Sequence, residues 1–382
     1  MTPSAVLPGG PGAAWDWLLA VRDRLVASPR FRALAAAVPV TRPFARQRTR
    51  ALFDLCAGFV YSQVLHACVE LNLFDILAEG PQTVPALAVR LGLPPPGAER
   101  LLLAAVSLKL AARRTGGRIG LGPLGAAMVG NAAISEMVRH HRMLYADLQD
   151  PVVLLRGEMR DTALSAYWAY SGNAGAAGLG PEVAAYTALM AASQPLVAGE
   201  ILAAYSLRRH RCLLDVGGGD GSFLQAAGTR APGLQLRLFD LPPVAAKATA
   251  RFAAAGLQGR AQAAGGDFLS DPLPPGADII SLVRVIHDHD DGAALRILAA
   301  AHAALPPGGT VLLAEPQSGT AGAEPVGDAY FGFYLMAMGR GRTRTVGELT
   351  ALLHAAGFAS VRRHPTRTPL LVGVLTAARP GL

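Results

Sequence analysis

A glycine-rich stretch after a short apolar run is the clearest sign of chemistry in this chain. Residues 213–221 read Leu-Leu-Asp-Val-Gly-Gly-Gly-Asp-Gly, and residues 222–227 are typical of the start of a helix. Glycines at a turn between strand and helix permit backbone angles that side chains forbid, and they let a ligand approach the main chain closely. The spacing does not fit G-x-G-x-x-G, and no Gly-Lys-Ser/Thr follows, so neither a dinucleotide loop nor a phosphate loop is predicted.

Acidic residues narrow the ligand that this loop could hold. Asp215 lies inside the first apolar run, where it would repel a pyrophosphate and suit a cationic or amine-bearing ligand. Asp240 ends the next apolar run about 20 residues beyond the loop, the position from which an acid meets ribose hydroxyls. Asp267 ends a third segment and could accept a hydrogen bond from an adenine amine, with the ring of Phe268 beside it for stacking. Each acid alone also fits a turn or a cap, but the three in order predict S-adenosylmethionine, a cofactor without phosphate.

A histidine that follows another apolar strand could act as a base. The run 279–286 is followed by His287, Asp288 and further acids. A parallel strand would deliver His287 to the carboxyl edge of the sheet, on the side of the glycine loop. Methyl transfer requires that an acceptor oxygen be aligned and its proton removed, and imidazole suits that task. We therefore predict that His287 is the general base and that Asp288 is a helix cap or structural acid.

The elements that must position these residues can be inferred from the periodicity. From residue 213 onward strands alternate with helices, which predicts a parallel α/β sheet. Before it, helical patterns over 51–79, 83–90 and 98–112, then a turn at 113–118 between short strands, follow the order of a winged helix, which also occurs in DNA-binding proteins. The helix at 98–112 is apolar nearly all round, which predicts burial rather than base reading. We expect a scaffold and dimer interface, and no nucleic acid.

Four motifs in order resemble the small-molecule O-methyltransferases of the caffeate and acetylserotonin type. They are Asp-Val-Gly-Gly-Gly-x-Gly, Phe-Asp-Leu-Pro, Gly-Gly-Asp-Phe and the His-Asp pair, and the resemblance covers about residues 50–375. It implies an α-helical winged-helix dimerisation domain followed by a C-terminal doubly wound, Rossmann-like α/β methyltransferase domain with a seven-stranded sheet whose last pair is antiparallel. We expect a basic amphipathic extension over 1–50, the dimerisation domain over 51–180 and the methyltransferase domain over 181–382.

The resemblance also implies the site residues. His287 would be the catalytic base, and Glu315, at the end of the strand 310–314, would orient its imidazole and stabilise the imidazolium. The expected contacts to S-adenosylmethionine, with S-adenosylhomocysteine as product and no metal, are Asp215, Gly217, Gly219, Asp240, Leu241, Asp267, Phe268 and Arg284. The expected lining of the acceptor pocket is Tyr145, Tyr186, Met190, Tyr330, Phe331, Phe333, Tyr334, Met336 and Met338. Aromatic and Met side chains suit a long apolar acceptor, although part of this set also fits plain core packing.

The chain departs from the plant members at three positions near the predicted base. His289 stands where they have Trp, Val283 where they have a Lys near the cofactor, and Thr343 where they have a second Glu. With one orienting carboxylate missing, true base catalysis by His287 and catalysis mainly by proximity both remain open.

Two blocks, 52–65 and 144–157, are similar to the hydroxyneurosporene (demethylspheroidene) O-methyltransferases of carotenoid synthesis. That similarity implies the tertiary 1-hydroxyl of an acyclic carotenoid as acceptor, an alcohol far less acidic than a phenol. A polyketide phenol or a tetrapyrrole remains an alternative acceptor. The non-enzyme alternative is a winged-helix regulator with S-adenosylmethionine as effector.

Composition limits the class of protein. A hydrophobic content of 51% with 16% charged residues indicates a large core and excludes disorder. Cys56, Cys68 and Cys212 lie in apolar contexts, which indicates reduced, buried thiols. We find neither the pattern of a secretory signal nor a charge-free apolar run of about 18 residues, so we expect a cytoplasmic protein without a spanning helix.

The segment 13–50 interleaves apolar and aromatic side chains with eight arginines. A basic amphipathic segment with tryptophans suits peripheral contact with an anionic membrane, here the inner or photosynthetic membrane. A helix packed on the other chain of a homodimer, with solvated arginines, fits equally. The formal net charge of +8 slightly favours an anionic partner.

Overall fold

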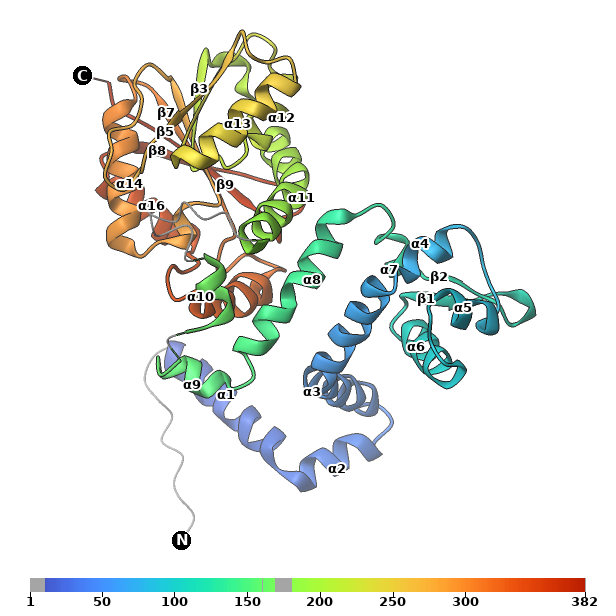
Figure 1. The fold of residues 1–382 in the computed structure, drawn as a ribbon. Coiled ribbons are helices and arrows are strands. Elements are labelled where there is room, and N and C mark those ends of the chain that lie inside the picture. The colour runs from blue at the N-terminus through green and yellow to red at the C-terminus, as the bar shows by residue number, and fades with distance from the viewer. Residues whose placement is uncertain (1–10, 160, 169–180, 382) are drawn as a thin grey trace. The chain divides into compact units, whose positions relative to one another are not determined.

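The computed structural model describes residues 11–159, 161–168 and 181–381. The chain folds into two compact units, residues 1–129 and 130–382. The ribbon in Figure 1 shows helices in the first unit and a sheet with helices on both faces in the second.

The first unit begins with three helices, α1 (Pro11–Ala27), α2 (Pro29–Ala37) and α3 (Arg42–Glu70). Among the described residues, α3 is the one helix long and apolar enough to cross a membrane by length and composition, and a single such helix is weak evidence for a span. Cys56 lies on α3 and is exposed, so the prediction of three buried thiols is wrong at this residue, while Cys68 and Cys212 are buried as predicted.

The winged-helix order is confirmed in the rest of this unit. It consists of α4 (Leu73–Ala78), α5 (Val84–Arg90), α6 (Pro95–Ser107), β1 (Ala111–Arg113), β2 (Ile119–Leu121) and α7 (Pro123–Ala126). The side chain of Thr83 caps α5 by accepting a hydrogen bond from the Ala86 amide at 3.4 Å. The predicted helix 98–112 is wrong at its end, because Lys109 takes a left-handed φ of 60° and the following residues pair as β1 with β2.

The second unit opens with α8 (Ala132–Asp147), α9 (Pro151–Leu155), α10 (Ala163–Trp168) and α11 (Pro181–Ala204). Its sheet has the order β5-β4-β3-β6-β7-β9-β8. The strands are β3 (Cys212–Val216), β4 (Gln235–Asp240), β5 (Ala261–Gly265), β6 (Ile279–Val283), β7 (Thr310–Glu315), β8 (Ala359–His364) and β9 (Gly373–Ala378). The first five are parallel and β9 is antiparallel to both β7 and β8, which confirms the predicted seven-stranded sheet.

Helices cover both faces of this sheet, as Figure 1 shows. They are α12 (Ser222–Arg230), α13 (Pro242–Ala254), α14 (Asp291–Ala304) and α16 (Val346–Ala355). Successive strand residues point to opposite faces, so Leu213 packs with α11, α12 and α13, and Leu214 packs with α14 and α16. All five residues of β3 are buried, as expected of a central parallel strand.

The strand order places the predicted site at a reversal of the chain. From β3 the chain first moves outward to β4 and β5, and it then returns to the other side of β3 as β6. Ligands of such sheets bind in the crevice beyond the strand carboxyl ends at this reversal. Three short helical segments follow at this edge or beside it, η4 (Ile286–Asp288), the π-helix η5 (Pro325–Phe331) and α15 (Gly332–Ala337).

Candidate active site

The glycine loop after β3 has the backbone geometry that its sequence predicts. Gly217, Gly219 and Gly221 have φ values of 68°, 60° and 81°. A Cβ atom on Gly217 would lie 2.8 Å from Val285 Cγ2, so that glycine is needed for packing. Apart from Gly219 and the two residues next to it in the chain, no described residue has an atom within 4 Å of a Cβ built on Gly219, so the main chain there borders open space. A ligand can therefore approach the backbone at Gly219.

Asp215 is buried below this loop with one oxygen satisfied. Its Oδ1 accepts a hydrogen bond from Ser281 Oγ at 2.6 Å, while Oδ2 has no partner in the described part of the chain. Burial raises the pKa of Asp215 to about 7, and the nearby charge of Asp240 acts in the same direction. An unpartnered buried carboxylate oxygen needs a donor, and a bound amine or cation would supply one.

Asp240 links the end of β4 to the glycine loop. Its carboxylate accepts hydrogen bonds from the amides of Gly219 at 2.9 Å and Leu241 at 2.7 Å. Burial raises the pKa of Asp240 to about 6, although both amide bonds favour the charged form. Backbone amides thus fix both oxygens of the Asp240 carboxylate beside Gly219, the residue at which the main chain borders open space.

Asp267 and Phe268 follow β5. Asp267 Oδ1 accepts a hydrogen bond from the Leu269 amide at 2.9 Å, so the side chain takes part in its own turn. The ring of Phe268 meets His289 edge-on, with centroids 5.7 Å apart, and its Cε1 lies 3.5 Å from a Cβ built on Gly217. The ring of Phe268 therefore lies beside the glycine loop.

Arg284 has an uncommon backbone. Its φ is 56°, a left-handed conformation that is strained for a residue with a side chain and is found most often at functional sites. The guanidinium donates to Ser193 Oγ at 2.9 Å and to Gln194 Oε1 at 3.0 Å, both on α11. The side chain thus connects α11 to the segment that leads to His287.

The residues around the loop fit S-adenosylmethionine. They offer carboxylates for an amine, a sulfonium and ribose hydroxyls, an aromatic ring beside the loop, and a stretch of exposed backbone at Gly219. Among the residues that the structure describes, no three His, Cys, Asp or Glu side chains are grouped as metal ligands would be.

His287 is held between two carboxylates. Its Nδ1 is hydrogen bonded to Glu315 Oε2, and Glu315 Oε1 accepts from the amides of Val285 at 3.0 Å and Ile286 at 2.8 Å. Asp288 Oδ1 lies 3.0 Å from Nε2 without the alignment of a hydrogen bond. Burial opposes the charged imidazolium, but Asp288 and Glu315 outweigh it and raise the pKa of His287 above its usual value.

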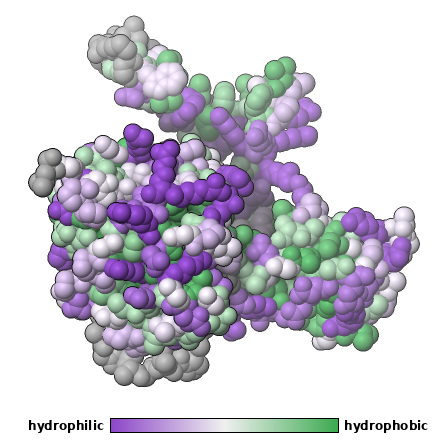
Figure 2. Space-filling model, turned by 90° about the horizontal axis from the view of Figure 1, so that it is seen from above, coloured by the Kyte–Doolittle hydropathy of each residue, from purple (hydrophilic) through white to green (hydrophobic). Residues whose placement is uncertain are grey.

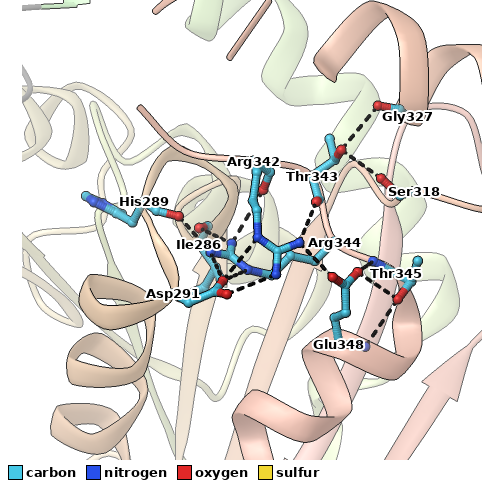
Figure 3. A network of polar contacts seen from close by, with 10 residues as sticks. All are labelled: Ile286, His289, Asp291, Ser318, Gly327, Arg342, Thr343, Arg344, Thr345 and Glu348. Atoms are coloured by element: carbon cyan, nitrogen blue, oxygen red, sulfur yellow. Dashed lines mark hydrogen bonds and ion pairs between the residues drawn. The ribbon is translucent and has the colours of Figure 1, made fainter. Parts of the chain in front are cut away.

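The backbone around His287 is fixed by Arg344, which we did not predict. This arginine is 2% exposed and donates to the carbonyl oxygens of Ile286 at 2.8 Å and His289 at 2.7 Å (Figure 3). Its Nε also donates to Asp291 Oδ1 at 2.8 Å. Arg344 therefore fixes the backbone through two carbonyl groups, one directly before His287 and one two residues after it.

Figure 3 also shows the neighbours of Arg344. Thr343 accepts a hydrogen bond from Ser318 Oγ at 2.7 Å and donates to the Gly327 carbonyl at 3.2 Å, with no contact to His287. Thr343, which stands where the plant members have a second Glu, thus forms hydrogen bonds with Ser318 and Gly327 instead of contacting the imidazole. Gly341 lies against the backbone of His287, since a Cβ built on Gly341 would be 2.3 Å from the His287 carbonyl oxygen.

The residues predicted to line the acceptor pocket differ in their surroundings. Tyr334 is buried and pairs with His140 Nε2 at 2.7 Å, and Tyr330 pairs with His141 Nε2 at 2.9 Å. Met338 is buried in the cluster that contains Tyr334, whereas Met336 is 39% exposed.

The remaining predicted lining residues are less informative. Tyr145 and Phe333 are half-buried, and the side chains of Tyr186 and Met190 lie outside the described residues. The ring of Phe331, which belongs to the expected lining, meets the imidazole of His287 edge-on, with ring centroids 6.3 Å apart. Phe331 is thus a member of the expected lining whose ring lies against His287.

A doubly wound sheet with a glycine loop, an acid before the loop, acids at the ends of the next two strands and a buried His–Glu pair defines a methyltransferase that uses S-adenosylmethionine. The comparisons agree with this class. Residues 145–359 match the model of the O-methyltransferase domain, and residues 53–138 match the O-methyltransferase dimerisation domain. The chain therefore belongs to the O-methyltransferase family, as its motifs predicted, and it carries the dimerisation domain of that family.

Relatives of known name span nearly the whole chain. It is 46% identical to the demethylspheroidene O-methyltransferase of Cereibacter sphaeroides, with 94% of each chain covered. It is 35% identical to the acetylserotonin O-methyltransferase of Mus musculus, with 87% of this chain and 89% of the relative covered. The crystal structure of human N-acetylserotonin methyltransferase in complex with S-adenosylmethionine superimposes with a TM-score of 0.71 at 27% identity, covering 88% of this chain and 98% of that chain.

Proposed function

We propose that the chain methylates the tertiary 1-hydroxyl of an acyclic carotenoid of the hydroxyneurosporene or demethylspheroidene type, with S-adenosylmethionine as methyl donor. The observation that carries this acceptor is the 46% identity, over 94% of both chains, to an enzyme named for demethylspheroidene. A second relative of that name, from Rhodobacter capsulatus, is 40% identical over 98% of this chain. A largely half-buried aromatic segment, 330–334, whose Phe331 ring lies against His287, suits a long apolar acceptor.

For the cofactor we propose that the loop and the strand ends divide the contacts. The open backbone at Gly219, with Gly217 beside it, would receive the amino acid part, and Asp215 Oδ2 would accept from its amine. Asp240, with Leu241 next to it, would accept from the ribose hydroxyls. Three further residues complete the set proposed for the adenine and carboxylate ends: Asp267, Phe268 and Arg284.

We propose that His287 is the general base. When bound, S-adenosylmethionine supplies an electrophilic methyl group on a sulfonium. As the acceptor oxygen takes up that methyl group, Nε2 of His287 would receive the proton of the hydroxyl. Glu315 holds Nδ1–H, so Nε2 carries the lone pair, and the carboxylate stabilises the imidazolium that forms. Tertiary alcohols are weakly acidic, so a base of raised pKa suits this acceptor.

We further propose that the chain acts as a homodimer through its N-terminal domain and that residues 13–50 contact an anionic membrane surface. The dimerisation-domain match over 53–138 supports the first statement. Exposed tryptophans and arginines in α1 to α3 support the second, because such a segment binds at the interface of anionic bilayers.

The decisive experiment is mass spectrometry of acceptors incubated with the purified full-length protein and isotopically labelled methyl donor. We expect one labelled methyl group on each modified 1-hydroxyl of a hydroxylated acyclic carotenoid supplied in detergent micelles. Methylation of a polyketide phenol in the same assay, with no product from the hydroxycarotenoid, would overturn the proposed acceptor. A His287→Ala sample reports the rate of methyl transfer without the base.

A further inference from the structure

The N-terminal arm, which we define as residues 11–53, contains a groove remote in sequence from the catalytic motifs. It lies along α2 and the first half of α3 and has a volume of about 490 Å³. Its apolar lining comes mainly from Phe31, Ala35, Ala36, Ala45 and Phe53. The small alanine side chains leave the space open, and the volume is within the range of about 300–1,000 Å³ typical of ligand pockets.

Two arginines beside this apolar lining have no partner among the residues that the structure describes. Arg46 and Arg48 line the groove, and across the described residues neither guanidinium has a hydrogen bond or an ion pair. Other arginines of the arm are engaged. Arg32 donates to the Ala27 carbonyl at 2.8 Å and Arg42 to the Ala37 carbonyl at 2.8 Å, where they close the ends of α1 and α2. The groove thus combines an apolar lining with two guanidinium groups that have no partner among the described residues.

The surface of the arm has the same mixed character. Trp15 is 62% exposed, Leu34 61% and Phe44 68%. The arm carries eight arginines and only two aspartates. Figure 2 shows hydrophobic and hydrophilic side chains next to one another on the helices that follow the grey N-terminal residues. Such a surface is costly in water and matches the boundary between headgroups and acyl chains of a bilayer.

We propose that this groove binds one anionic phospholipid, with an acyl chain along Ala35, Ala36 and Ala45 and the phosphate between Arg46 and Arg48. The inference rests on the proposed membrane contact and assigns that contact a specific lipid-binding site. An amphiphile explains both halves of the lining, whereas a nucleic acid has no chain to fill the apolar half. A second copy of the arm would bring its own surplus of arginines against this one, and the dimerisation-domain match begins only at residue 53. Binding of a membrane lipid in the groove would place the enzyme at the bilayer, in which an apolar acceptor dissolves.

The first test uses full-length protein and calorimetric titration with dioctanoyl phosphatidylglycerol below its micellar concentration. We expect saturable binding of one lipid per chain, with at least a tenfold loss of affinity in Ala35→Trp, whose indole fills the groove. Ala33→Trp is the matched control, because Ala33 is exposed on α2 and does not line the groove. Equal affinity of both variants, or binding without saturation, would overturn the proposal.

The second test uses flotation with phosphatidylcholine vesicles that do or do not contain phosphatidylglycerol. We expect the double variant Arg46→Glu with Arg48→Glu to lose binding to anionic vesicles by a larger factor than Arg24→Glu with Arg30→Glu, a pair of the same charge outside the groove lining. Equal losses of vesicle binding in the two double variants would mean that the basic surface binds anionic lipids diffusely and that the groove is not a lipid-binding site. If Ala35→Trp dissociates the dimer in sedimentation, or if duplex DNA displaces the short-chain lipid, the groove belongs to another partner and the proposal fails.

Methyl transfer to a detergent-solubilised hydroxycarotenoid separates the two proposals. We expect both groove variants to keep this activity, since no groove residue is among the proposed catalytic residues. Lipid binding without methyl transfer would reject the proposed acceptor and leave the groove intact. Methyl transfer without saturable lipid binding would do the reverse.

Discussion

The carboxylate of Glu315 serves His287 twice, since one oxygen binds the imidazole Nδ1 and the other accepts from the two amides that precede the histidine. The same side chain therefore fixes both the ring and the backbone that carries it. Glu315 is 1% exposed, so water does not compete for either oxygen. The tautomer that leaves Nε2 as acceptor follows from this arrangement.

Replacing His287 with Ala should lower the rate of methyl transfer by about 10²–10⁴-fold if the imidazole removes the proton in the transition state. Glu315→Gln keeps an oxygen for the two amides, but its NH2 group would donate to Nδ1 and leave the imidazole proton on Nε2, so we expect a loss in kcat of similar size. Cofactor affinity, measured by calorimetry, should change little in either variant. Near-normal turnover of His287→Ala would mean that the site works by proximity alone.

Asp288 should set the pH at which the base becomes available. The negative charge beside Nε2 raises the pKa of His287, so the base is protonated at a higher pH than a free imidazole and activity rises as the pH rises through that pKa. Asp288→Asn removes this charge and lowers the pKa of His287. The rising limb of kcat against pH should therefore move to lower pH. A limb that stays in place, or that moves to higher pH, would contradict this role.

The sequence was sufficient for the sheet and for the residues at its edge, because glycine loops and acids at strand ends follow local rules. It was not sufficient for Arg344. Periodicity does not distinguish a buried arginine from a solvated one, and Arg342, two residues earlier, is exposed and makes surface ion pairs instead. The end of α6 also escaped prediction, since its apolar pattern continues into β1 and only the left-handed Lys109 breaks it.

Gly341→Ala should damage catalysis more than folding. A Cβ there would lie 2.3 Å from the His287 carbonyl oxygen and 2.7 Å from the Asp288 carbonyl carbon, both backbone atoms that cannot turn away. Gly339→Ala is the matched control, with a φ of 82° against 83° and its nearest neighbour at 3.9 Å. Both variants should lose about 1–2 kcal/mol of stability from the left-handed backbone. Only Gly341→Ala should also lower kcat, and equal kcat values in the two would contradict a role in placing His287.

Gly219→Ala should weaken cofactor binding without a comparable effect on folding. Its Cβ would meet no atom of the described residues within 4 Å beyond its chain neighbours, so the added methyl group would project into the space proposed for the cofactor. Gly308→Ala provides the control, because Gly308 also has a positive φ and open surroundings but lies in the turn before β7. Thermal unfolding should shift similarly in both, while calorimetry with S-adenosylhomocysteine should show reduced affinity only for Gly219→Ala. Unchanged affinity would remove Gly219 from the site.

Asp215→Asn should make the protein without cofactor more stable at about pH 8 than at about pH 5, relative to wild type. Burial raises the pKa of Asp215 from 3.8 to about 7, so the unfolded chain ionises first and wild-type stability falls as the pH rises through this interval. The neutral amide escapes that loss, which is at most about 4 kcal/mol for a shift of this size. An amide nitrogen without an acceptor would offset part of the gain. Chemical denaturation at both pH values measures the difference, and a variant with the same change in stability at each would show that the buried carboxylate is ionised at both, with a pKa that burial does not raise.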